Sequence, residues 1–123
     1  FLFLNLLIIG FYYLALRALA GLSNIALGIL GAERRTLDDT YAVFAYSFPA
    51  TILFVPLGLV GVILLRDGMV MPAALGAGWL WSCLVAAIGL SIFHSTSLLR
   101  AGAAILLAHL ALLSLTLIGL PFL

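Results

Sequence analysis

AERRTLDD, residues 32–39, separates two long apolar stretches and decides how the chain is divided. It contains five of the chain's charged residues, and the whole chain has only five Lys or Arg and four Asp or Glu. Two shorter polar breaks follow, RDGMVMP at 66–72 and FHSTSLLR at 93–100. A bilayer requires about 20 apolar residues per helix. The breaks therefore predict four membrane-spanning helices, at about 2–30, 40–65, 73–93 and 98–120, in a single transmembrane domain covering 1–123.

Composition indicates the same class of protein. The chain is 67% hydrophobic and 7% charged, with a mean hydropathy of +1.40. So few charged side chains cannot cover a water-soluble surface, so we predict an integral membrane protein whose main partner is the lipid bilayer. An open sheet edge in lipid would leave backbone groups unpaired, which predicts an all-α bundle. The net charge of +1 gives no basic face, and nucleic acid is excluded as a partner.

The orientation follows from the arginines near the ends of the spans. Arg34 and Arg35 share one side with Arg100, whereas Arg66 stands alone on the other. The sequence therefore predicts that loops 31–39 and 94–100 are cytoplasmic and that the C-terminus lies on the opposite side.

The second span has a recognisable start. Thr36 fits an N-cap, with Asp39 three residues later as the acidic partner of a capping box and Asp38 beside it to complement the helix dipole. Pro49 and Pro56 each remove a backbone donor, and we expect both to kink the helix.

Two segments resemble the Yip1-domain family of multi-pass membrane proteins: GAERRTLDDTYAVFAYSFPATILFVPLG at 31–58 and GLSIFHSTSLLRAGAAILL at 89–107. The resemblance rests on the order and spacing of a polar turn, an "aYs..P" segment and a later "gl...h....ra" segment. The positions that carry it are Thr36, Ala45, Tyr46, Ser47, Pro49, Gly89, Leu90, His94, Arg100 and Ala101. It implies a five-span protein with cytoplasmic first and third loops here. Because the chain opens FLFLNLLIIG without methionine, we expect the first span and an N-terminal region to precede it.

The inventory of chemical groups argues against an enzyme. All four acidic residues lie in the predicted loops, and only two histidines are present. His94 precedes Ser95-Thr96-Ser97, but adjacent residues on a helix do not face each other. An intramembrane hydrolase, the weaker alternative, requires His94 within reach of a serine and an acid. Asp38, Asp39 and His94 would form a crude metal or proton site if they met. We predict no catalytic residue, no metal and no cofactor.

Transport is the second alternative, as a small-solute permease or channel subunit. Polar side chains inside a bilayer are functional candidates, and the candidate intramembrane contacts are Arg17, Asn24 and His109. Arg17 lies about 20 Å along a helix from Leu30, which predicts the outer third of the bilayer and a side chain reaching the outer interface. No carboxylate within a predicted span can pair with it, which weakens the permease reading.

The remaining class is helix packing and protein binding. Small residues recur every four positions at Ala74 and Gly78, at Ala104 and Ala108, and along the first span. We therefore favour a non-enzymatic scaffold, accessory subunit or trafficking-type adaptor that binds other membrane proteins. The expected cytoplasmic docking surface consists of Thr36, Asp38, Asp39, Tyr41, Tyr46, His94 and Arg100.

Overall fold

The structure is a computed structural model that describes residues 2–33 and 35–119. Its described residues form α1 (Leu2–Ile29), α2 (Leu37–Ser47), the 3₁₀ helix η1 (Phe48–Leu53), α3 (Phe54–Leu65), α4 (Val70–Phe93) and α5 (Leu98–Gly119), and no strand. Four helical stretches are long and apolar enough to cross a membrane: Leu2–Ile29, Leu37–Leu65, Val70–Phe93 and Leu98–Gly119. The prediction of four helical spans is confirmed, and the chain has the character of an integral membrane protein. Residue 120, the expected end of the fourth span, lies outside the described residues.

The second span is a broken helix. Pro49 lies at the start of η1, where the missing backbone N–H needs no helical partner. Pro56 lies in the first turn of α3, a position that tolerates proline. The change from α2 to η1 coincides with Pro49, and Pro56 lies within the continuous helix α3. The hydroxyl of Thr51, in η1, pairs with that of Ser82 at 2.8 Å and so ties the broken segment to α4.

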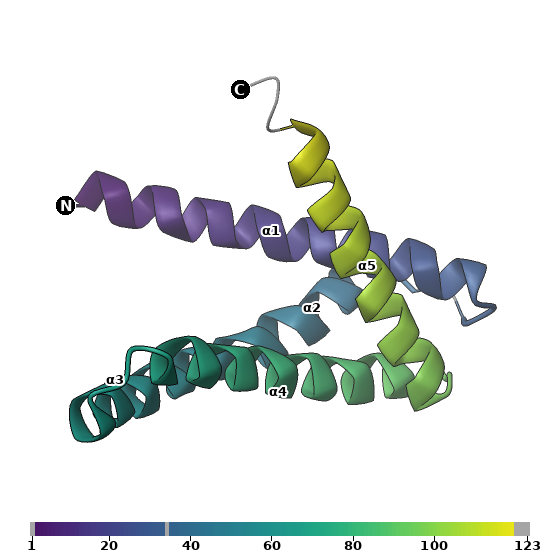
Figure 1. The fold of residues 1–123 in the computed structure, drawn as a ribbon. Helices are drawn as coiled ribbons and strands as arrows, with labels where there is room; N and C mark the ends of the chain where they lie inside the picture. Colours follow the sequence, from purple (N-terminus) through teal and green to yellow (C-terminus); the bar gives the residue numbers. More distant parts are fainter. Residues whose placement is uncertain (1, 34, 120–123) are drawn as a thin grey trace.

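All four spans meet at one end of the bundle, and away from it α3 and α4 pack closely on each other. α1 contacts α2 and α5, while α4 contacts α2, η1, α3 and α5. The buried core comes from the second half of α1, from α2, from the last half of α4 and from the first half of α5. Away from this core the first half of α1, the α3–α4 hairpin and the last half of α5 diverge (Figure 1). Side chains 2–14 of α1 are all exposed.

Small residues bring the helices together, as their spacing predicts. Ala20, Ala104 and Ala108 are buried in the core that α1 and α5 share. Gly78 of α4 is buried beneath Phe54, whose ring lies 2.9 Å from where a Cβ on this glycine would stand. The ridge of small residues on α4 therefore packs within this chain, and α3 occupies it.

Gly78→Ala provides a test of this close contact. The added methyl group cannot fit without moving Phe54, and overpacking of this kind costs about 1 to 3 kcal/mol. Gly76→Ala is the matched control, because a Cβ there meets nothing within 4 Å and both changes gain the same helix propensity. We expect the free energy of unfolding of Gly78→Ala to be lower than that of Gly76→Ala by about 1 to 3 kcal/mol, measured by denaturation in mixed micelles. Equal free energies of unfolding would show that Phe54 of α3 does not pack on Gly78 of α4.

Candidate functional site

The polar groups gather at the packed end of the bundle, where loop 31–36 meets the start of α2 and the end of α4. Thr36 has extended backbone angles, and its Oγ1 accepts a hydrogen bond from the Asp39 backbone N–H at 3.2 Å. The predicted N-cap is confirmed. The carboxylate of Asp39 accepts from the Thr36 hydroxyl at 2.7 Å, so it braces the cap through the side chain of Thr36. The Asp39 carboxylate therefore has a structural partner at the start of α2.

His94 lies at the centre of this end and is fully buried. It is the C-cap residue of α4. Its Nδ1 donates to the backbone oxygen of Glu33 at 2.7 Å, because a carbonyl can only accept, and its Nε2 lies 3.1 Å from the hydroxyl of Thr40. One imidazole thus joins α4, the first loop and α2. The expectation that His94 lies on a docking surface is wrong, because its ring is enclosed by the two segments that it joins.

The hydroxyl of Thr40 has two possible acceptors. It lies 3.1 Å from Nε2 of His94 and 3.2 Å from the backbone oxygen of Thr36. A hydroxyl carries one hydrogen, so in a neutral His94 Thr40 donates to Nε2. If Nε2 is protonated, it donates to Thr40, which then donates to Thr36. The contact can be formed in either protonation state of the ring, and it links the ring to the first turn of α2.

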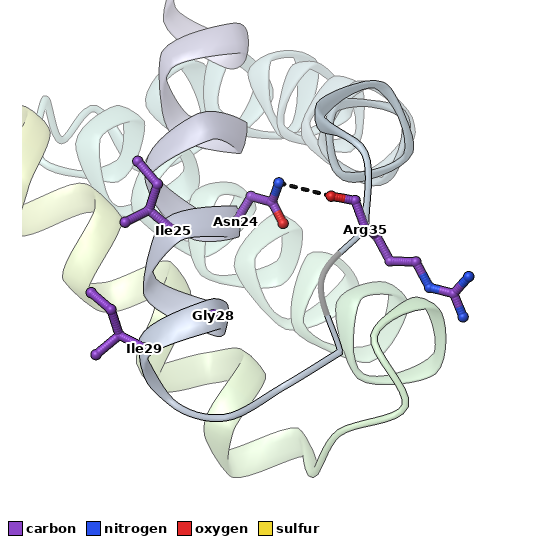
Figure 2. A pocket seen from close by; sticks show the side chains of 5 residues that line it. All are labelled: Asn24, Ile25, Gly28, Ile29 and Arg35. Carbon is purple, nitrogen blue, oxygen red and sulfur yellow. Dashed lines mark hydrogen bonds between the residues drawn. The ribbon is translucent and has the colours of Figure 1, made fainter.

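The loops on this end are held by two further contacts. Nε of Arg35 donates to the backbone oxygen of Phe93 at 2.9 Å, which places a cation against the last carbonyls of α4. Nδ2 of Asn24 donates to the backbone oxygen of Arg35 at 3.0 Å, and the Arg35 side chain points away from Ile25 and Ile29 (Figure 2). The backbone of Arg35 therefore lies level with Asn24, back along the last turns of α1. The Arg35 contact could not be predicted from a local pattern, because it joins residues 58 positions apart.

Arg17 has a partner that the sequence argument did not assign to it. Its Nη1 lies 2.8 Å from Oδ1 of Asp38, and its Nε donates to the Tyr13 hydroxyl at 2.9 Å. The guanidinium also lies 5.0 Å from the ring centre of Tyr41. The first loop folds back to Asn24 and so brings α2 alongside the middle of α1. Asp38 is then level with Arg17.

The predicted surface residues are only partly brought together. Asp38 and Tyr41 contact Arg17, and Thr36 and Asp39 bond to each other at the same helix start. Tyr46 is 87% exposed, and it projects from α2 two turns away from Asp38. Arg100 is exposed, and its guanidinium forms no ion pair within the described residues.

The considered metal or proton site does not form from these groups. Asp38 is paired with Arg17, Asp39 with Thr36, and both nitrogens of His94 are occupied. Among the residues that the structure describes, no group of three or more His, Cys, Asp or Glu could hold a metal ion. The serine and acid that the hydrolase alternative requires do not contact His94 in this part of the chain, since its partners are a threonine and a carbonyl.

Comparison with known proteins adds nothing to this geometry. No family model, no curated protein and no solved structure matches the chain. The site is therefore interpreted from its own contacts.

Proposed function

We propose that this protein acts without chemistry of its own, by binding another membrane protein as a scaffold, accessory subunit or trafficking-type adaptor. The observation that carries the proposal is the ion pair between Arg17 and Asp38 on the open face of α1 and α2. The side chain of Asp38 is 79% exposed and that of Arg17 is 35% exposed. Exposed charge at the edge of a membrane domain is costly against lipid, and a polar groove or opposite charge on a partner would cover it favourably.

The shape of α1 supports the same proposal. Side chains 2–14 of this helix are exposed over a length of about 20 Å, roughly two-thirds of the hydrocarbon core of a bilayer, at about 1.5 Å per residue. The helix stands apart from the α3–α4 hairpin over this length (Figure 1). We propose that a helix of the partner packs on this half of α1 while the partner's loop region meets Arg17 and Asp38.

The orientation and the family belong to the proposal as well. We propose that loops 31–39 and 94–100 face the cytoplasm, with the C-terminus on the other side, as the arginine count predicts. Contacts from His94 to Glu33 and from Arg35 to Phe93 join these loops at one end of the bundle, which supports a common side. The resemblance to the Yip1 domain would place a docking role on that side.

Site-specific photo-crosslinking in native membranes tests the proposal. A photoreactive residue at Ile8, in the open half of α1, is expected to give a stoichiometric cross-link to one other membrane protein, identified by mass spectrometry. The matched control is Ile63 of α3, because it is similarly apolar and also exposed. We expect the Ile8 product, and not any Ile63 product, to decrease in the Arg17→Leu and Asp38→Asn variants. Lipid adducts alone at Ile8 would refute the proposal, and a product containing only this chain would replace it with self-association.

A further inference from the structure

A small cavity lies between α4 and α5 in the membrane-spanning part of the bundle. Its volume is about 180 Å³, and its walls include Trp79, Cys83, Gly102, Ile105 and His109. Leu80 and Leu106 line its rim and are exposed, so it opens toward lipid. The cavity is distinct from the polar end of the bundle, and it holds the histidine that the docking proposal does not use.

The ring of His109 is fixed by three contacts. Its Nδ1 lies 2.8 Å from the backbone oxygen of Ile105, one turn earlier on α5. It stacks on Phe48 with a centroid distance of 6.2 Å, and the Trp79 ring meets it edge-on at 5.2 Å. A ring held from three directions has little conformational freedom to lose when a ligand binds.

The contact with Ile105 also decides which nitrogen can receive a ligand. A carbonyl oxygen only accepts, so Nδ1 carries the hydrogen and the neutral ring presents the lone pair of Nε2. Within the described residues, Nε2 has no hydrogen-bond partner. In lipid no water is at hand to satisfy such an acceptor, and its desolvation is a cost that a donor would remove.

We propose that this cavity binds a lipid-soluble phenol, such as a quinol head group presents, whose hydroxyl donates to Nε2 of His109. An apolar cavity of about 150 Å³ is known to accept a benzene ring, so the available volume matches one small substituted ring. The edge of Trp79 and the ring of His109 provide aromatic neighbours for it. A phenol has one hydroxyl donor on an otherwise apolar ring. This matches a cavity whose wall is mostly apolar and includes the one acceptor, Nε2 of His109.

A matched pair of probes tests the hydrogen bond directly. 4-Bromophenol carries the donor, whereas 4-bromoanisole has a similar shape with the donor methylated, and bromine quenches tryptophan fluorescence on contact. The chain has two tryptophans, Trp79 and Trp81. The protein would be a Trp81→Phe variant in lipid nanodiscs, which retains Trp79 as its one tryptophan. A Trp79→Phe variant, which retains Trp81, measures quenching by probe dissolved in the lipid. Probe concentrations are compared after correction for partition into the bilayer.

We expect saturable quenching of Trp79 at roughly tenfold lower concentration for the phenol than for the ether, since one hydrogen bond is worth about that factor. In His109→Phe the preference should vanish. Gly102→Leu should weaken both probes, because it fills the cavity from a position where a Cβ meets nothing within 4 Å. Unchanged helical content by circular dichroism shows that the variants are folded.

Equal potency of the two probes on the protein with native His109 would overturn the proposal, and so would a preference that persists in His109→Phe. Absence of saturable quenching by either probe would overturn it too. The first comparison needs no change in the cavity, so a poorly folded variant cannot obscure it.

Discussion

Replacing His94 by alanine is expected to lower the free energy of unfolding by about 2 to 4 kcal/mol. The ring is fully buried, and its loss leaves a void, removes the donor to the Glu33 carbonyl and leaves the Thr40 hydroxyl with Thr36 as its one partner described above. The contacts join the first loop, α2 and α4, which no other single side chain does among the contacts described above. Denaturation of the purified protein in mixed micelles, followed by circular dichroism, measures the change.

Two variants show whether the effect has this cause. Ile92→Ala removes a large side chain from the same turn, but Ile92 is 72% exposed, so we expect a loss below about 1 kcal/mol. Thr40→Val removes only the hydroxyl and should cost about 1 kcal/mol. Combined with His94→Ala, Thr40→Val should cost less than it does alone, because the hydroxyl has already lost its contact with His94 and keeps only its bond to Thr36. Additive losses would show that the two residues do not interact.

The spans were predictable because hydropathy and length alone define them in lipid. Polar breaks at 32–39, 66–72 and 93–100 coincide with the observed ends of the helices to within a few residues. Thr36 was predictable as an N-cap because capping depends on neighbouring residues only. Pro49 likewise signalled the change to η1.

The site was less predictable because its contacts join distant parts of the chain. Asp38 lies 21 positions from Arg17 in sequence, and a first loop that left the end of α1 directly would keep the two apart. The loop instead folds back along α1, held by the contact from Asn24 to Arg35 and by His94, whose partner Glu33 is 61 positions away. Because the loop folds back, Asp38 lies beside Arg17. No local pattern in the sequence encodes such a reversal.

Asp38→Asn is expected to lower the free energy of unfolding, because it leaves the Arg17 cation without its carboxylate. Arg17 belongs to α1, a helix long and apolar enough to cross a membrane, where an unpaired cation is costly. The converse change, Arg17→Leu, should lower the free energy of unfolding less. Asp38 is highly exposed and keeps a favourable place in the first turn of α2. The same micelle denaturation measures both.

The double variant separates pairing from burial. With Arg17→Leu in place there is no cation left without a partner, so adding Asp38→Asn should be nearly neutral, and the two single losses should not add. Additive effects, or no measurable loss in Asp38→Asn alone, would mean that lipid phosphate already neutralises Arg17 or that water solvates it.

The same stability measurements show whether a lost cross-link reports a changed docking surface or a destabilised protein. Arg17→Leu and Asp38→Asn are also the variants that should release the proposed partner, yet they should differ in stability. If cross-linking at Ile8 decreases in both variants, including the stable Arg17→Leu, the ion pair contributes to the docking surface itself. If it decreases only in Asp38→Asn, the loss follows from the stranded cation and a disturbed start of α2. The asymmetry between the two charges, one 35% and the other 79% exposed, is what makes these two causes distinguishable.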